Sequence, residues 1–311
     1  MDRGLPAESE LAERCGMSMS MTAEQAPQSP SASSPRILHA VSGPLAIRDI
    51  QDLMAYPFFS LAKSRRITPI VYRTAELSIH VEGTHEHGLA TIWDADVLIW
   101  AITQLVHARN NGKPTSQHLA ATPHAILGFL GRGRSVRDYL RLRAALDRLQ
   151  STSVATSLRQ RLARRLHRFS WLSEWTQHAD CFGRPLQLEL TLPDWLYASA
   201  IAPSMVLTLD PAYFSLTGGI ERWLYRLVRK HGGRQHAGWQ FEVTHLYRKS
   251  GSTSRYSDFA SDLRRLVDKQ RLPGYRLVLE RTRSKAEVLA FFPHRDAVAC
   301  RSGTVHKPVD R

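Results

Sequence analysis

The same order of predicted elements occurs twice along the chain, and this repetition constrains the fold more than any other feature. Each half has a helix, a short helix, a turn rich in glycine or serine, a longer helix and a β-ribbon. The helices are predicted at 93–108, 125–130, 135–149, 219–230, 244–249 and up to 269, and the ribbon strands at 169–175, 186–192, 275–280 and 288–292. This order predicts an α+β fold of two tandem winged-helix (helix-turn-helix plus β-ribbon) domains.

Local signals support several of these boundaries. Thr122 followed by Pro123 has the form of a helix N-cap with proline in the first turn. Ser135 and Asp138 have the spacing of a capping box, which predicts the start of the longer helix. A weak internal repeat is also present, in which Asp138, Tyr139 and Leu146 correspond to Asp258, Phe259 and Leu266 at one constant offset.

Composition defines the expected domain limits. Residues 1–45 are rich in serine, proline, alanine and glutamate, so they cannot bury enough apolar area to offset their ordering entropy, and we expect a disordered N-terminal tail. Order is expected to begin near Ile47. Ala202-Pro203 separates an N-terminal winged-helix domain, 46–202, from a C-terminal one, 203–296. Residues 297–311 are expected to be a flexible tail.

The charge balance favours a polyanionic partner. The 311 residues carry a formal net charge of +14 and a pI near 10.2, which points first to nucleic acid and second to an anionic membrane. Cys15, Cys181 and Cys300 lie far apart, so neither a disulfide framework nor a zinc site is predicted. No apolar run reaches membrane-spanning length and no signal peptide is evident, so we expect a cytoplasmic protein.

The helix at 135–149 is the strongest candidate for contact with DNA. Helical phase places Tyr139 and three leucines on one face, and Arg137, Arg141, Ala144 and Arg148 on the other. In a helix-turn-helix the second helix enters the major groove, where arginine is the commonest reader of guanine. A solvated helix face is the alternative interpretation. However, residues 131–170 hold eleven arginines against only Asp138 and Asp147, and a solvated face usually mixes signs.

The predicted double-stranded DNA contacts fall into three groups. The first turn and helix contribute Arg132, Arg134, Ser135, Arg137, Arg141 and Arg148. The segment predicted to form the first wing contributes Arg159, Arg161, Arg164, Arg165 and Arg168. The second half contributes Arg248, Lys249, Ser254, Arg255, Ser257, Ser261, Arg264, Arg265 and Lys269. A further stripe on the helix that opens the second half, formed by Arg222, Arg226 and Arg229, is expected to contact phosphates or to face solvent; the sequence does not separate these two.

No motif predicts catalysis. The stretch Thr84-His85-Glu86-His87-Gly88 resembles the two-histidine metal site of nickases, but that site needs a bulky apolar residue where Glu86 stands. A polar hairpin loop is therefore the favoured interpretation. Gly131-Arg132-Gly133 lacks the Lys-Ser/Thr of a phosphate-binding loop, and no G-x-S-x-G motif or carboxylate pair stands out. We expect no enzyme activity, no cofactor and no bound metal.

Five stretches resemble the plasmid replication initiator protein A family of proteobacteria, and together they span about 48–293. They are DLMAYPFFSLAK from Asp52, ATIWDADVLIW from Ala90, LDRLQST from Leu146, LPDWLY from Leu192 and ERWLYR from Glu221. The resemblance implies two winged-helix domains. It also implies a protein that binds origin repeats, opens the adjacent duplex and helps load host replication proteins such as the replicative helicase and initiator. The family brings no catalytic motif to this chain.

Two other functions remain open from the sequence. A winged-helix transcription regulator, or an autorepressor only, would use the same elements, and only an initiator must support replication of a linked origin. A nickase acting on one strand belongs to a different class, and it would relax supercoiled origin DNA in the presence of a divalent metal. The target sequence, and whether a homodimer or a monomer binds it, do not follow from the sequence.

Overall fold

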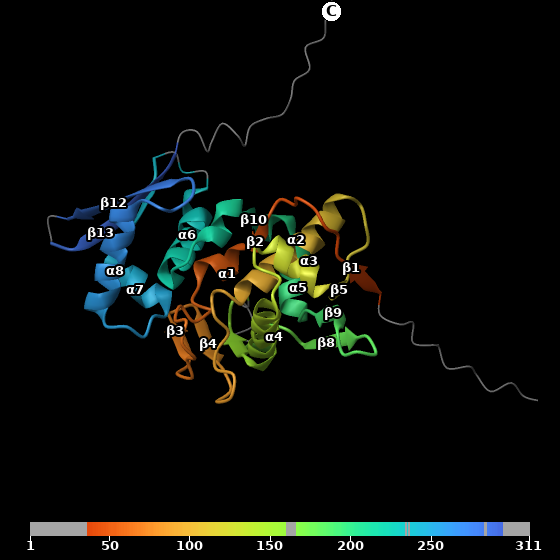
Figure 1. Ribbon diagram of the computed structural model, residues 1–311. Helices are drawn as coiled ribbons and strands as arrows, with labels where there is room; N and C mark the ends of the chain where they lie inside the picture. The colour runs from red at the N-terminus through yellow and green to blue at the C-terminus, as the bar shows by residue number, and fades with distance from the viewer. Residues whose placement is uncertain (1–35, 160–165, 234, 236, 283–284, 295–311) are drawn as a thin grey trace, which may run out of the picture. The chain divides into compact units, whose positions relative to one another are not determined.

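The computed structural model describes residues 36–159, 166–233, 235, 237–282 and 285–294 (Figure 1). The described residues from Arg36 onward form one compact unit by their contacts, and the predicted tail residues 1–35 and 297–311 lie outside the described part. The fold is mixed α+β, as predicted. The predicted helices of the repeated order and the strands expected at 186–192, 275–280 and 288–292 are present within a few residues of their expected limits. The strand expected at 169–175 was wrong, because this range is divided between two strands, His167–Ser170 and Glu174–Ala179, of different sheets.

The first half is built around α2 (Ala95–Asn110), a helix that is buried on nearly every side. An all-round apolar helix belongs in a core, which the sequence predicts. The remaining helices of this half are α1 (Gln51–Ala55), α3 (Pro123–Phe129), α4 (Val136–Ser151) and α5 (Asp194–Ile201).

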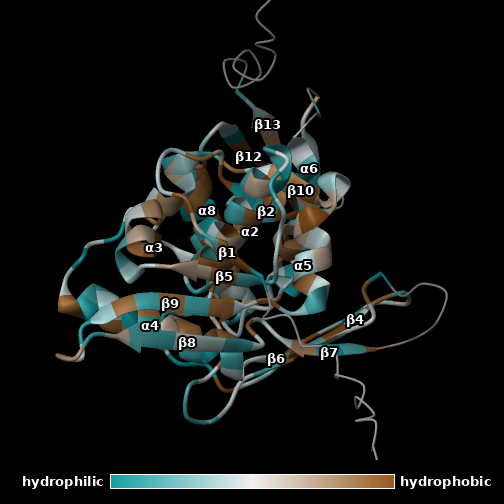
Figure 2. Ribbon diagram, turned by 90° about the vertical axis from the view of Figure 1, so that its right-hand side faces the viewer, coloured by the Kyte–Doolittle hydropathy of each residue, from teal (hydrophilic) through white to brown (hydrophobic). Residues whose placement is uncertain are grey.

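Two four-stranded sheets complete the first half (Figure 2). The first has the order β1-β5-β9-β8, in which only β1 and β5 are parallel. Its strands are β1 (Ile37–His39), β5 (His118–Ala121), β8 (Glu174–Ala179) and β9 (Pro185–Thr191). The second sheet is antiparallel with the order β3-β4-β6-β7, from β3 (Ile70–Arg73), β4 (Ser78–Glu82), β6 (Ser153–Thr156) and β7 (His167–Ser170).

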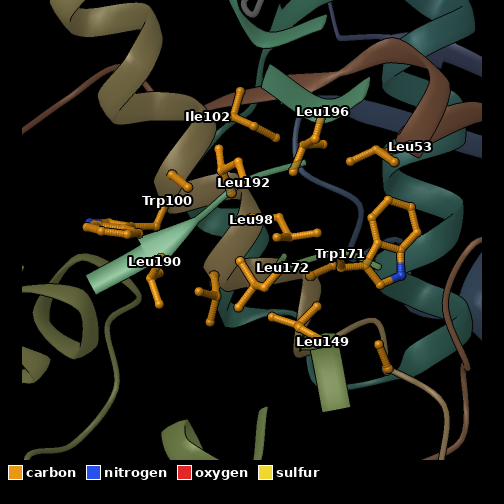
Figure 3. Packing of buried hydrophobic residues seen from close by; sticks show 14 of the residues in the cluster. Leu53, Leu98, Trp100, Ile102, Leu149, Trp171, Leu172, Leu190, Leu192 and Leu196 are labelled. Carbon is orange, nitrogen blue, oxygen red and sulfur yellow. The ribbon is translucent and has the colours of Figure 1, made fainter. Parts of the chain in front are cut away.

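One apolar core joins these elements (Figure 3). Leu98 and Trp100 of α2 pack with Leu149 of α4 and with Trp171, all at most 1% exposed. Trp171 also stacks on Phe59 with ring centroids 4.8 Å apart. Burying an aromatic side chain of this size stabilises a fold by roughly 2–3 kcal/mol. Trp100, Trp171 and Trp195 are core residues, whereas Trp93 and Trp175 are only partly buried against this core.

The second half has its own core around α6 (Gly219–Gly232). A three-stranded antiparallel sheet has the order β11-β13-β12, from β11 (Trp239–Glu242), β12 (Tyr275–Arg281) and β13 (Glu287–Pro293). Helices α7 (Val243–Ser250) and α8 (Tyr256–Lys269) lie between β11 and β12 in the chain. Between the halves, two 3-10 turns flank the strand β10 (Val206–Thr208), which pairs with β2 (Arg48–Ile50).

The repeat is structural as well as sequential. Helices α3 and α7 begin at Pro123 and Val243, and α4 and α8 begin at Val136 and Tyr256, so both pairs are offset by 120 residues. Each half also places its last ribbon strand between the other two, as β5-β9-β8 and β11-β13-β12. The two halves therefore share one order of elements and one sheet order.

Two parts of the first half differ from expectation. Strand β1 lies within the predicted tail and pairs with β5, so order begins before Ile47, because the β5 edge provides ladder partners for an otherwise weak segment. The predicted first wing, 159–168, was wrong as a wing. The ribbon that follows α4 and pairs with β5 is β8–β9, whereas the basic segment connects β6 and β7 of the other sheet.

Candidate nucleic-acid interface

Helices α3 and α4 are held by the capping residues that the sequence predicts. The Thr122 hydroxyl accepts from the Ala125 N–H at 3.1 Å, with Pro123 in the first turn of α3. Ser135 and Asp138 form a capping box at the start of α4. Because each cap satisfies N–H groups that a helix leaves unpaired, the turn between the two helices has a defined geometry.

The exposed face of α4 is basic and partly apolar. Leu142, Leu146 and Leu149 are buried as predicted, and Tyr139 is half-buried with its hydroxyl donating to Gln177 of β8. The exposed residues of α4 are Val136, Arg137, Leu140, Arg141 and Arg143. Arg143 was not selected as a DNA contact, because helical phase assigned Arg148, and not Arg143, to the exposed face.

Arg148 does not lie on this exposed face. It donates two hydrogen bonds of 2.7 Å to Asp94, whose carboxylate is buried beside the start of α2. The carboxylate raises the pKa of Arg148, so the guanidinium stays charged. Arg132 in the α3–α4 turn is bound in the same way, with a 2.8 Å contact to Asp96 and another to the Trp93 carbonyl. The structure therefore gives both arginines a partner inside the protein that fixes α4 and its turn against α2.

A groove of about 870 Å³ borders the exposed face of α4. Besides Arg141, it is lined by Lys63 and Arg65, two exposed residues that the sequence analysis did not select. Lys63 lies 5.7 Å from the Trp93 ring centroid, and Arg65 donates to the Glu86 carbonyl. The basic run Lys63-Ser64-Arg65-Arg66 was the available signal, but it lies about seventy residues before α4 in the chain.

The arginines of the basic segment that was predicted to form the first wing differ in their surroundings. Arg159 is bound to Asp52 and Ser199 and stacks over Trp195 at 4.1 Å, so its charge is used within the protein. Arg168 is largely exposed and donates to Glu82 at 3.0 Å. The predicted contacts Arg161, Arg164 and Arg165 lie outside the described residues.

The β8–β9 ribbon presents different residues at its tip. Phe182 is 80% exposed, and Arg184 stacks over its ring at 5.8 Å. The Asp180 carboxylate accepts from the N–H groups of both residues, at 2.9 and 2.8 Å, which fixes the turn. This tip was not predicted, because the strand at 186–192 was recognised but its partner was expected at 169–175 instead of 174–179.

Helix α8 and the turn that precedes it expose a similar but more mixed face. Arg248, Arg255, Ser257, Ser261 and Lys269 are exposed, as are Arg264 and Arg265. Arg264 forms a bidentate pair with Glu287 of β13, and Arg265 pairs with Asp262. Ser254 is half-buried within the turn, where it bonds to Ser252.

Lys249 is buried rather than exposed. Only 8% of it is accessible, and its ammonium group lies 4.6 Å from the Tyr56 ring centroid and 5.8 Å from that of Tyr72. Burial lowers the pKa of Lys249 to about 8. The lysine therefore contacts the first half through cation–π interactions, in which the ring faces replace part of its lost hydration.

Both interpretations of the α6 stripe were wrong, because Arg222, Arg226 and Arg229 are 4%, 1% and 6% exposed. Arg222 binds Asp96 at 2.8 Å, and Arg226 binds Asp49 at 2.8 Å. Arg229 donates to the Thr208 carbonyl. Sequence reasoning failed here because the compensating carboxylates lie far away in the chain, on α2 and β2. These buried pairs connect the core elements of the two halves.

The His85–His87 loop is a tight turn, in which Thr84 and Gly88 form an isolated bridge. His87 lies 3.9 Å from Glu86. Among the described residues, no group of three or more histidine, cysteine or carboxylate side chains is arranged to hold a metal ion. Within the same residues, no helix is both long and apolar enough to cross a bilayer.

Two comparisons with solved structures concern the fold alone. Selenomethionine-substituted domains 2 and 3 of RctB match with a TM-score of 0.55 at 14% identity, over 75% of this chain and 94% of that one. A second structure of RctB domains 2–3 matches with the same score and identity, over 81% of this chain and 99% of that one. The mixed α+β arrangement therefore has a solved counterpart.

The sequence comparisons identify the family. The "Putative replication protein" of Wigglesworthia glossinidia brevipalpis is 31% identical over 228 residues, which cover 72% of this chain and 82% of that protein. The family model for Replication initiator protein A matches residues 48–277, which include α1 through the start of β12. The resemblance seen in the sequence is confirmed, and the chain belongs to the replication initiator protein A family.

Proposed function

We propose that this replication initiator is a sequence-specific double-stranded DNA-binding protein that reads plasmid origin repeats through two winged-helix units. The duplicated topology carries the proposal. Each half has the order helix, strand, two helices and a ribbon whose last strand lies in the middle of the sheet. In a protein with this order, the second helix of the pair is the one suited to the major groove. Helices α4 and α8 occupy that position.

The exposed face of α4 is suited to base reading. Arg137 and Arg143 form no ion pair with any described residue, and Arg141 has only a 3.5 Å contact with Asp138 at the surface. Surface pairs of this kind contribute little, so the guanidinium remains available for guanine. Val136 and Leu140 are exposed beside them, where apolar side chains are suited to contact thymine methyl groups.

The phosphate contacts follow from the same geometry. We assign them to exposed cations around the two helices, which are Arg134, Arg168, Arg248, Arg255 and Lys269 from the original prediction, with Lys63 and Arg65 added. Arg132, Arg148, Arg159 and Lys249 are left out of this set, because each already has its charged group bound inside the protein. Such contacts supply affinity without sequence information.

The wider role rests on family membership. The protein would open the duplex beside the repeats and help load host replication proteins in the cytoplasm, with exchange between monomer and homodimer as one way to control this. We propose no catalytic step, since the buried carboxylates of Asp49 and Asp96 are used in structural pairs with arginines.

A footprint of the purified full chain on DNA flanking its own gene tests the proposal. With competitor DNA at about 150 mM salt, non-specific affinity is weak, in the range of 10⁻⁴–10⁻⁶ M. Protection of a regular array of direct repeats is the expected result. Protection of a single promoter site would favour a regulator, and salt-sensitive coating without a protected site would contradict sequence-specific reading. Relaxed or covalently linked supercoiled DNA in the presence of a divalent metal would overturn the assignment as a non-enzyme.

A further inference from the structure

A pocket of about 480 Å³ lies between β3 of the first half and α7 of the second, and it is lined by cationic and neutral residues alone. The basic lining residues are Arg66, Arg73, His245 and Arg248. Uncharged partners such as Tyr247 and Ser252 complete it, and no carboxylate is among the lining residues. A concave site that gathers charge of one sign focuses the electrostatic field on its opening.

The four basic residues have different parts in the pocket. Arg66 has a structural role. Its guanidinium donates to the carbonyls of Thr68, Pro69 and Gly251, and so it links the segment before β3 to the residue that follows α7. Gly251 permits this close approach, since it has a φ of +61° and an added Cβ would lie 2.9 Å from Pro57. Arg73 and Arg248 are exposed, and their side chains form no hydrogen bond or ion pair with any described residue.

The surroundings indicate an uncompensated positive field. His245 is half-buried, and burial lowers its pKa, with Lys249 and Arg248 lowering it further. Glu242 opposes this effect but is the smallest of the four causes. Lys249 is buried against the rings of Tyr56 and of Tyr72, a lining residue of the pocket, and it is not paired with a carboxylate. A site built this way is stabilised by an anion that supplies the missing negative charge.

We infer that this pocket binds phosphate groups of the duplex backbone, with Arg73 and Arg248 as the contacting cations. The inference deepens the proposed function and rests on it. The pocket begins at Gly251 and Ser252, which form the turn leading into α8, so a duplex lying on α8 brings its phosphates to the opening. Because Arg73 comes from the first half and Arg248 from the second, one phosphate segment would be held by both halves at once.

The test measures how the DNA affinity of the full chain depends on salt. Fluorescence anisotropy gives the slope of log K against log salt for wild type, Arg73→Ala, Arg248→Ala and the double variant. Each lost phosphate contact should reduce the magnitude of the slope by about 0.9, so the double variant should lose about 1.8. The reduction should be equal on specific and non-specific duplexes, and Arg73→Lys should retain the slope because it retains the charge.

Lys113→Ala is the matched control, because Lys113 is an exposed cation in the α2–β5 turn, outside the pocket and both proposed reading helices. It should leave the slope unchanged. Thermal unfolding should be the same for all variants, since both arginines are exposed.

Three results would overturn the inference by different routes. A wild type that binds DNA with the same slope as the double variant would overturn the pocket alone. The pocket would also be ruled out as a DNA contact if inorganic pyrophosphate shifted the His245 ring resonances of wild type but not of the double variant, while the DNA slopes of the two proteins stayed equal. The pocket would then bind a small phosphate compound and not the duplex backbone. A wild type that binds no duplex would overturn the proposed function and this inference together.

Discussion

Replacing Arg226 with methionine removes the cation that compensates the buried Asp49 carboxylate. The two side chains are 2% and 0% exposed, and the Nε–Oδ2 distance is 2.8 Å. Removing one partner of a buried pair costs about 3–5 kcal/mol, because the other charge is left in a medium of low polarity. We therefore expect Arg226→Met to lower the free energy of unfolding by that amount near neutral pH, although the protein keeps its packing volume.

The loss should depend on pH in a definite direction. Burial raises the pKa of Asp49, and Arg226 is the main group that opposes this effect. In Arg226→Met the opposition is gone, so the folded-state pKa of Asp49 rises further above the unfolded value of about 3.9. The deficit relative to wild type is smallest at low pH, where Asp49 is protonated in both folded proteins. It grows as pH rises from the folded-state pKa of wild type toward that of the variant, because only the folded variant still binds the proton. The limiting slope is about 1.4 kcal/mol per pH unit.

Urea unfolding of wild type and Arg226→Met from pH 4.5 to 8 measures both effects. Two controls separate the pair from its surroundings. The double variant Asp49→Leu with Arg226→Met should recover most of the loss, since an apolar replacement of a buried pair is often neutral or stabilising. Arg141→Met, at an exposed position, should change the free energy of unfolding by no more than about 0.5 kcal/mol. A loss below about 1 kcal/mol for Arg226→Met at every pH would refute the reasoning.

Three further predictions concern residues that the sequence analysis selected as DNA contacts. Arg141→Ala should weaken binding to the specific site by about 1–3 kcal/mol and relax sequence preference at one position, as measured by binding to a set of single-base variants; equal losses on every sequence would contradict a base contact. Arg148→Ala should instead lower the unfolding free energy by about 1.5–3 kcal/mol, because it leaves Asp94 buried without its bidentate partner; an unchanged urea midpoint would contradict this structural role. For Lys249, whose pKa is lowered to about 8, the unfolding free energy of wild type should rise relative to Lys249→Met between pH 8 and 10, since the folded chain releases the proton first. A constant difference over that range would contradict the burial.

The order of elements could be read from the sequence because local signals agreed with one another. Ser135 and Asp138 defined the start of α4, and the alternating leucines of 186–192 defined β9. The offset between Asp138 and Asp258 correctly implied that α4 and α8 are equivalent helices. Caps and periodicity act over a few residues, which is why a single sequence contains them.

The candidate site was harder to predict, because charge patterns do not reveal distant partners. Arg222 and Arg226 repeat on one face of α6 as DNA-binding arginines would, yet they bind Asp96 and Asp49, which lie 126 and 177 residues earlier. Arg148 continued the arginine stripe of α4 by helical phase, but Asp94 binds it against α2. An arginine on a helix face is therefore informative only once the carboxylates of the other elements are placed.

Strand pairing was the other limit. The first ribbon was expected to consist of strands 169–175 and 186–192, with the basic residues 159–168 in the wing that follows α4. In the structure, β6 and β7 lie between α4 and this ribbon in the chain, and β6 pairs with both β4 and β7. The chain then forms β8, which pairs with β9. Sheet order depends on contacts of long sequence separation, which periodicity does not encode.

A hydroxyl-radical footprint on a single origin repeat tests most directly whether the protein reads DNA through two units. Wild type should protect two segments whose centres lie about one helical turn, or roughly 10 base pairs, apart. The double variant Arg137→Ala with Arg141→Ala should lose one protected segment, and Arg255→Ala with Ser257→Ala should lose the other. A single protected segment that both double variants weaken alike would contradict two reading helices.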